Sequence, residues 1–406
     1  MRLPPDDHFH LTYCTNIHPA SGWDAVFSTL ARYAPALKAR LLPDKPFGIG
    51  LRLSAREARE LLAGGRLQTF REFLDGQGLY VALINGFPHG AFHGTVVKAD
   101  VYAPDWRDEA RVRYTLDLIE ILRHLLPAGV DGGVSTAPLS YKHWMAEGDE
   151  AGWASVTRNV SRVAGALAKV REDHGALIHL DLEPEPDCSI ENTDETIAFF
   201  ERRLLEAGAR AVAGFLGCGI DVARARLLEH VRVCFDCCHF AVEFEDPEPA
   251  LERLTAAGIR IGRAQLSSAI EVTVPADRDA AGAVIERLRA FADPVYLHQV
   301  VEQRDGRLAR FPDLGEALQG SRRDGERAWR IHFHVPLFTA GYEGLGSTQD
   351  YVSRTIGHLL RRRLTTHLEI ETYTWDVLPP GLKVDLLESI AREYAWVLDA
   401  TSSVRP

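Results

Sequence analysis

A short acidic and histidine motif stands out in the chain because both of its side chains can bind a metal ion. The apolar run 231–235 is followed by Asp236, and His239 comes three residues later. Such a run predicts a strand, with Asp236 at its C-terminal end and His239 in the first turn beyond it. A carboxylate and an imidazole placed in this way can converge on one cation or one polar substrate. The alternative is a solvated strand end at which Asp236 only caps a helix.

Two other apolar runs also end in carboxylates. The run 176–182 leads to Glu183 and Glu185, and the run 366–370 leads to Glu371. In a parallel barrel all strands point the same way, so the residues at their C-terminal ends meet on the face that carries the active site. We prefer Glu183 to Glu185 there because it directly follows its strand.

The resulting set of side chains predicts one divalent metal ion. Carboxylate oxygens from Glu183, Asp236 and Glu371 suit hard ions such as Mg²⁺ or Mn²⁺, and an added histidine widens the choice to Zn²⁺ or Co²⁺. The sequence leaves the identity of the ion open.

Short apolar runs alternate with amphipathic stretches along the chain, which predicts strands separated by helices. Eight strands with intervening helices make a (β/α)₈ TIM barrel of the α/β class. The expected strands are 8–13, 47–53, 79–84, 130–134, 176–182, 231–235, 260–266 and 366–371. The expected helices include 22–40, 54–76, 107–126, 150–172, 193–214 and 347–362.

Two further strand-like runs lie between the seventh and eighth expected strands. The run 294–301 and the run 307–311, joined by an Asp-Gly turn, predict an inserted hairpin. The run 329–336 contains His332 and His334, which share one face of a strand and can reach the mouth of the barrel. We therefore expect one domain, 1–406, with extended loops and an insertion at about 270–345.

Length and composition agree with a single large globular domain. The chain has 406 residues, of which 46% are hydrophobic and 25% charged, and a barrel of about 250 residues can exceed about 400 with insertions. No apolar stretch is long enough to span a bilayer, and the N-terminus lacks the apolar core of a signal peptide. We expect a cytoplasmic protein without membrane insertion, whose six cysteines are reduced thiols.

The overall charge bears on the partners of the protein. A formal net charge of -11 is unlike the basic footprint of nucleic-acid enzymes. We expect a small polyhydroxylated substrate and no nucleic acid, while self-association into a homo-oligomer is left open.

Three segments carry a resemblance to a known superfamily. The segments Leu182-Glu183-Pro184, Cys234-Phe-Asp236-Cys-Cys-His239 and Ile370-Glu371-Thr372 resemble the metal-site motifs of the xylose isomerase-like barrels. That superfamily contains sugar isomerases, ketose 3-epimerases and the endonuclease IV group. The resemblance implies that Glu183, Asp236 and Glu371 bind metal, and that His239 contacts substrate or metal. It also implies a histidine ligand on the seventh strand, where this chain has Gln265, a weaker ligand for transition metals.

A narrower likeness is to the EboE proteins, barrel proteins of a bacterial gene cluster linked to metabolite export or trafficking. The segment Asn85-Gly-Phe-Pro-His89-Gly-Ala-Phe-His93-Gly resembles their long third loop, and the likeness extends to Ser135-Thr-Ala-Pro-Leu-Ser-Tyr-Lys142. Here His89 and His93 are candidate substrate-lid residues, with plain surface groups as the alternative. Lys142 could neutralise an anionic group of a ligand, or it is a solvated loop lysine.

Three functions follow as hypotheses. The first is a metal-dependent isomerase or epimerase in which Glu183 and Glu371 move a proton next to a carbonyl, with His239, His332 and His334 holding the substrate. The second is a metabolite-binding or traffic protein without turnover, which Gln265 favours. The third is a phosphodiesterase of the endonuclease IV type, against which the acidic charge argues. The number of bound metal ions distinguishes the phosphodiesterase from the other two candidates. Proton exchange into substrate distinguishes the isomerase or epimerase from the binding protein.

Overall fold

Eight parallel strands form a barrel that carries the candidate site at one end. The structure is a computed structural model that describes residues 1–90, 97–146, 148–319, 325–378, 381 and 385–404. The strands follow the order β1-β14-β7-β6-β5-β4-β3-β2, and a parallel bridge between Cys14 and Gly50 joins the two ends of this sheet. The barrel strands are β1 (His10–Tyr13), β2 (Phe47–Arg52), β3 (Leu79–Asn85), β4 (Gly132–Thr136), β5 (Ile178–Leu182), β6 (Val231–Asp236), β7 (Ile261–Leu266) and β14 (His367–Ile370). The predicted TIM barrel is confirmed, and each strand lies within about two residues of its expected range.

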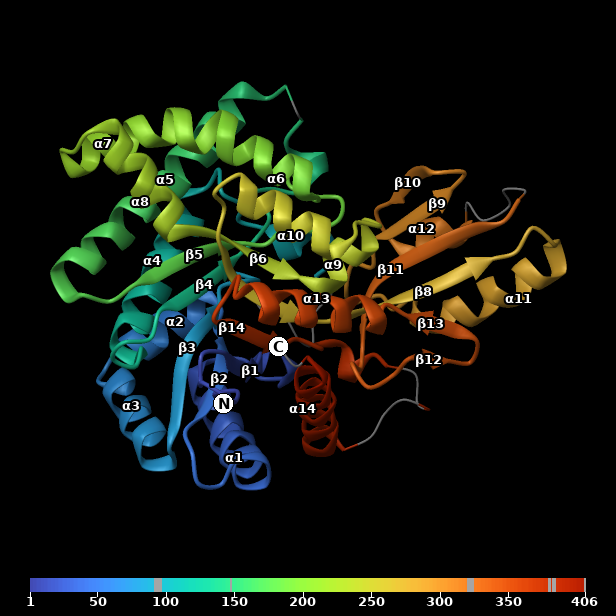
Figure 1. Cartoon of the computed structure of the whole chain (residues 1–406), viewed down its shortest axis with the longest axis horizontal. Coiled ribbons are helices and arrows are strands. Elements are labelled where there is room, and N and C mark those ends of the chain that lie inside the picture. The colour runs from blue at the N-terminus through green and yellow to red at the C-terminus, as the bar shows by residue number, and fades with distance from the viewer. Residues whose placement is uncertain (91–96, 147, 320–324, 379–380, 382–384, 405–406) are drawn as a thin grey trace.

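Helices surround the barrel (Figure 1), because each strand is followed by an amphipathic segment that buries one face against the sheet. Local signals set their ends; for example, Ser54 and Glu57 form a capping box that begins α2. The helices outside the insertion are α1 (Trp23–Leu41), α2 (Ala55–Leu62), α3 (Arg66–Gln77), α4 (Glu109–Leu125), α5 (Glu150–His174), α6 (Thr193–Phe199), α7 (Ala209–Leu216), α8 (Ile220–His230), α9 (Cys237–Val242), α10 (Pro247–Ala256), α13 (Gln349–Arg362) and α14 (Leu386–Ser403). A π-helical segment, Phe200–Gly208, joins α6 to α7.

The interior of the barrel contains a buried charge network instead of apolar side chains alone. The guanidinium of Arg263 on β7 donates to Asp181 Oδ2 at 3.0 Å and to Glu369 Oε2 at 3.1 Å. All three side chains are fully buried. Glycines make the room for them, since a Cβ built on Gly50 would lie 1.7 Å from Glu369 Oε1 and one on Gly262 would lie 1.9 Å from Asp181 Oδ1. The network therefore restricts which residues can occupy these positions of the barrel strands below the site.

The insertion between β7 and β14 is a second sheet, larger than the expected hairpin. Its antiparallel strands follow the order β10-β9-β11-β8-β13-β12. A hairpin of β9 and β10 forms one edge of this sheet, but β9 overlaps the expected run 294–301 only at residues 300 and 301. The sequence analysis predicts no strand at β8, which begins after a single residue, Ser267, beyond the end of β7. The elements of the insertion are β8 (Ser268–Val274), α11 (Arg278–Leu288), β9 (Val300–Arg304), β10 (Arg307–Phe311), α12 (Leu314–Gln319), β11 (Arg327–Val335), β12 (Gly341–Tyr342) and β13 (Leu345–Ser347).

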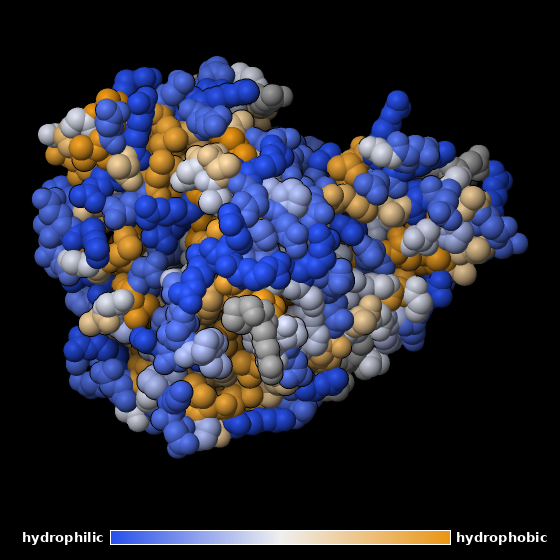
Figure 2. Space-filling view, viewed as in Figure 1, coloured by the Kyte–Doolittle hydropathy of each residue, from blue (hydrophilic) through white to orange (hydrophobic). Residues whose placement is uncertain are grey.

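The inserted sheet extends from one side of the barrel as a lobe, at the right of Figure 1. The face shown in Figure 2 is of mixed hydropathy, with hydrophobic patches interrupted by hydrophilic side chains. Within the described residues, no helix combines the length and the apolar composition needed to cross a membrane.

Candidate metal and active site

Three carboxylates lie where strands of the barrel end. Glu183 directly follows β5, Asp236 is the last residue of β6, and Glu371 directly follows β14. All three are buried. Asp236 Oδ1 accepts hydrogen bonds from the backbone nitrogen of His239 at 3.0 Å and from Ser267 Oγ at 2.7 Å. Asp236 therefore caps α9, as the alternative interpretation predicted, and also lies among the other carboxylates.

The carboxylates bring more negative charge together than a buried site tolerates. Burial raises the pKa of Glu183 well above its usual value, and the charges of Asp236, Glu371 and Glu185 raise it further. Glu183 Oε2 is buried and has no hydrogen-bond partner among the described residues. A proton or a cation must offset this charge, and an oxygen-rich donor set with an orphaned carboxylate oxygen fits a divalent cation.

Gln265 lies on β7 beside two of these acids, in the position where the resemblance implied a histidine. With its amide nitrogen turned toward them, Gln265 donates to Asp236 Oδ2 at 3.1 Å and to Glu183 Oε1 at 3.0 Å. In the opposite orientation its carbonyl oxygen faces the acids and accepts from Cys234 Sγ at 3.1 Å. The first orientation suits a site held together by hydrogen bonds, and the second suits a cation between the three groups.

Two side chains hold Glu371. Asn16 Nδ2 donates to Glu371 Oε1. His334, which the inserted strand β11 supplies, lies with Nδ1 at 2.8 Å from both Glu371 Oε2 and the Glu371 backbone oxygen. Burial lowers the pKa of His334, but Cys238 and Glu371 outweigh it and hold this pKa well above its usual value.

A second group of buried polar residues adjoins the carboxylates. His239 on α9 and His332 on β11 approach with their Nε2 atoms 3.2 Å apart. Burial first, and then the other histidines, lower the pKa of His332 well below its usual value, so that it is neutral. Glu185 lies nearby, with Oε1 at 3.5 Å from His332 Nδ1.

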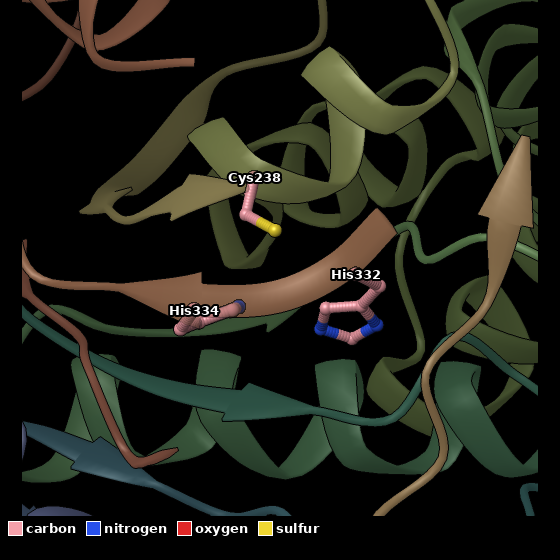
Figure 3. Close-up of side chains that lie close together, drawn as sticks. All are labelled: Cys238, His332 and His334. Carbon is pink, nitrogen blue, oxygen red and sulfur yellow. The ribbon is translucent and has the colours of Figure 1, made fainter. Parts of the chain in front are cut away.

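The insertion contributes directly to the site through β11 and the segment before β9. Figure 3 shows His332 and His334 side by side on β11, with Cys238 of α9 on the adjoining element. The ligand atoms of these three side chains all lie within 4.8 Å of one another, as do those of Asp236, His239 and His334. The register of β11 against β8 shifts between Ile331 and Val335, where the two histidines lie. This irregularity is typical of a strand end that presents functional side chains.

Three glutamates and three histidines of these groups line one pocket at the mouth of the barrel, whereas the predicted site residues Asp236 and Gln265 are not among its lining residues. Aromatic and apolar side chains from the third loop and from the insertion form the rest of its wall. The lining residues are Asn16, Asn85, Phe87, Pro88, Val97, Lys98, Val101, Tyr102, Glu183, Glu185, His239, Tyr296, Leu297, His332, His334, Glu371 and Tyr373. A polar floor with an apolar rim is typical of a small-molecule site.

Not every predicted site residue reaches this pocket. Lys142 lines a different pocket, next to Trp153 and Phe199, and its Nζ pairs with Glu191 at 2.7 Å. His89 packs its ring against Tyr114 at 5.0 Å, and burial lowers the pKa of His89 to about 4. His93 lies outside the described residues.

Sequence reasoning missed several residues of the pocket. Asn16 and Tyr102 lie in short 3-10 helices with no metal-site pattern. Gln299, which does not line the pocket but holds His332 and Glu185, precedes a strand of the insertion. Glu185 was considered only as a competitor of Glu183, although both side chains line the pocket. The repeated acid in Glu183-Pro-Glu185 was the one signal that could have indicated two roles.

Comparison with known proteins supports the fold. No protein-family model matches the chain, and no curated protein matches its sequence. A xylose isomerase domain protein from Planctomyces limnophilus is similar in structure, with a TM-score of 0.50 and 12% identity over 98% of this chain and 97% of that one. At this identity the likeness shows the barrel fold.

Two further solved structures align with lower TM-scores. The IolI protein, whose structure contains a zinc atom, aligns with a TM-score of 0.49 and 12% identity over 98% of this chain and 99% of that one. A D-tagatose 3-epimerase-like protein aligns with a TM-score of 0.49 and 9% identity over 98% of both chains. The narrower resemblance to the EboE proteins is not confirmed by these comparisons. The likeness to the Planctomyces limnophilus protein thus supports the TIM barrel fold of this chain.

Proposed function

We propose that this protein is a divalent-metal-dependent isomerase or epimerase that acts on a small polyhydroxylated metabolite. The observation that carries the proposal is the pair Glu183 and Glu371, two buried carboxylates from different barrel strands that line one pocket. His334, which also lines the pocket, supplies a hydrogen-bonding group for a hydroxyl oxygen of the substrate. The EboE resemblance adds the proposal that the metabolite belongs to a biosynthetic or trafficking route.

The two glutamates have different surroundings, which suits them to different steps. Glu371 accepts a hydrogen bond from Asn16 and lies against His334. We assign Glu371 as the base that takes the proton from the carbon next to the carbonyl. Glu183 Oε2, which has no hydrogen-bond partner among the described residues, is free to return a proton. If the proton returns on the opposite face of that carbon, the centre is inverted.

A metal ion would contribute to the same reaction. Glu183, Asp236 and Glu371, with the carbonyl oxygen of Gln265 as a further ligand, would hold a divalent ion that polarises the carbonyl of a bound ketose. Polarisation makes the neighbouring C–H bond more acidic. The apolar rim of the pocket limits the access of water to the reacting carbon.

Deuterium exchange tests this proposal even when the product of the reaction is not identified. The protein, loaded with Mn²⁺, Co²⁺, Zn²⁺ or Mg²⁺, is incubated with a panel of ketoses in ²H₂O, and deuterium at the carbon next to the carbonyl is measured by mass spectrometry. We expect exchange with at least one ketose, reduced by about 10²- to 10⁴-fold in Glu183→Gln and in Glu371→Gln. The matched control is Glu302→Gln, a buried glutamate on β9 that does not line the pocket. Exchange that persists in both pocket variants would contradict the assigned roles.

A second candidate function is metabolite binding without turnover. The observation that favours it is Gln265, whose amide in one orientation ties Glu183 to Asp236 by hydrogen bonds and needs no cation. In that case ketoses or polyols bind to the metal-free protein, and no deuterium enters them under any metal loading. Calorimetric titration of the same panel separates the two candidates.

A further inference from the structure

We propose that Glu185, His239 and His332 form a second metal site, distinct from the carboxylate group around Glu183, for a borderline divalent ion such as Zn²⁺. One carboxylate oxygen of Glu185 and one nitrogen of each histidine lie within 4.8 Å of one another. All three side chains are more than nine-tenths buried and line the same pocket. Two imidazoles and one carboxylate are a donor set of catalytic zinc sites.

The hydrogen bonds of the two histidines show which nitrogen of each ring carries the hydrogen. His239 Nδ1 lies 2.9 Å from the carbonyl oxygen of Pro184, so it must donate. His332 Nδ1 lies 2.7 Å from Gln299 Oε1. The Gln299 amide cannot be turned, because its nitrogen donates to the carbonyl oxygen of Pro186 at 3.0 Å. His332 Nδ1 must therefore also donate.

The consequence is a contact between two nitrogen lone pairs. In neutral imidazoles with hydrogen on Nδ1, each Nε2 presents a lone pair, and here the two Nε2 atoms are 3.2 Å apart. Two lone pairs at this distance repel unless a cation or a proton lies between them. Zinc–nitrogen bonds of about 2.0–2.1 Å at a tetrahedral angle place two nitrogen ligands about 3.3 Å apart. The observed separation fits a shared metal ion.

Glu185 completes the donor set. Its Oε1 accepts from Tyr102 at 2.6 Å and from Gln299 Nε2 at 3.3 Å, whereas its buried Oε2 has no hydrogen-bond partner among the described residues. In each of the three residues, hydrogen bonds to the surroundings thus engage one polar atom, Nδ1 or Oε1, and leave the lone pairs of the other, Nε2 or Oε2, without a donor in the described part of the chain. Such outer hydrogen bonds orient the ligands of protein metal sites. Gln299 holds two ligands at once, so the inserted segment organises the site.

Cobalt binding tests this site without any measurement of turnover. The full chain, purified without an affinity tag and stripped with a chelator, is titrated with Co²⁺, with metal content and visible absorption as readouts. We expect about two ions per chain in the wild type, and the loss of one ion in Glu185→Gln and in His332→Gln. His230→Gln, which changes an equally buried histidine outside the pocket, is the control and should retain both ions.

Two further variants keep the test decisive if a ligand variant folds poorly. Gln299→Met keeps all three ligands but removes the hydrogen bonds that Gln299 makes to His332 and Glu185, and we expect about 10- to 100-fold weaker Co²⁺ binding at this site. The double variant Glu183→Gln with Asp236→Asn should keep the ion at the histidine pair. Circular dichroism reports whether each variant is folded.

The outcomes distinguish this site from the proposed function. Equal Co²⁺ binding by the wild type and His332→Gln overturns the site and leaves a shared proton between the two histidines. A single ion that is lost in His332→Gln but kept in the double variant supports the site and counts against an ion at the carboxylates. Absence of deuterium exchange, with the expected pattern of Co²⁺ loss, overturns the proposed function alone.

Discussion

At the scale of single residues, the barrel depends on a few buried charges whose environment sets their behaviour. Glu393 on α14 is fully buried, and its Oε1 accepts hydrogen bonds from Thr372 Oγ1 at 2.6 Å and from the backbone nitrogen of Leu337 at 3.2 Å. Thr372 directly follows Glu371, so this glutamate supports the floor of the pocket. Burial raises the pKa of Glu393 to about 7.

The raised pKa of Glu393 predicts a pH dependence of stability. The folded protein holds this proton more tightly than the unfolded chain, whose value is near 4.5, so the free energy of unfolding falls as the pH rises from about 4.5 to above 7. The loss is on the order of 3 kcal/mol. Glu393→Gln keeps the accepting oxygen and should be more stable than the wild type at pH 8, as measured by urea unfolding across pH. The exposed Glu172→Gln on α5 is the control, and a Glu393→Gln curve parallel to the wild type would contradict the prediction.

Arg263 provides a second prediction at this scale. It is the cation between the buried carboxylates of Asp181 and Glu369. Arg263→Met fills a similar volume but leaves both acids without their cation, and removal of one partner from a buried pair costs about 3–5 kcal/mol. Denaturant unfolding at pH 7 measures this loss. Arg158→Met, on the exposed side of α5, should change stability by less than about 0.5 kcal/mol.

At the scale of elements, close packing between strands and side chains decides where glycine is required. A Cβ at Gly50 on β2 would overlap Glu369 Oε1, whereas a Cβ at Gly76 on α3 would meet nothing within 4 Å. We predict that Gly50→Ala destabilises the protein by about 1–3 kcal/mol or more through overpacking. Gly76→Ala should stabilise it by up to about 1 kcal/mol, because alanine is the better helix former. Thermal unfolding measures the change in melting temperature of both variants. Equal changes would contradict the prediction, because they would show that Glu369 can move away from the added methyl group at little cost.

The inserted sheet also acts at the scale of elements, because it brings side chains into the pocket. Its central strand β11 carries His332 and His334 into the pocket, and Gln299, just before β9, holds His332 in place. The insertion is thus part of the candidate site.

At the scale of the whole molecule, metal ions and stability are linked. Ions that bind only the folded protein raise its free energy of unfolding by about 2.7 kcal/mol at a concentration 100 times the dissociation constant. We predict that Mn²⁺ or Zn²⁺ raises the melting temperature of chelator-treated protein, since the buried carboxylates lose their mutual repulsion. Differential scanning calorimetry gives the shift, which should be smaller in Glu183→Gln because that variant removes one of the charges. A larger shift in the variant would contradict metal binding at Glu183.

The sequence by itself determined the eight barrel strands and the acids at their ends. Runs such as Val231–Asp236 are recognised from local apolar patterning, and parallel strands of a barrel bring their C-terminal ends to one face. For that reason Glu183, Asp236 and Glu371 could be grouped from the sequence alone.

Only the tertiary structure decided which loop residues join them. Lys142 and Asn16 both follow barrel strands, yet Lys142 pairs with Glu191 in another pocket, whereas Asn16 holds Glu371. The path of each loop depends on packing against segments that are far away in the sequence. It therefore cannot be predicted from the local sequence pattern. The same reason explains why the sequence predicts a hairpin and one further strand where the structure has a six-stranded sheet. The pairing of β8 with β11 joins residues about 60 positions apart.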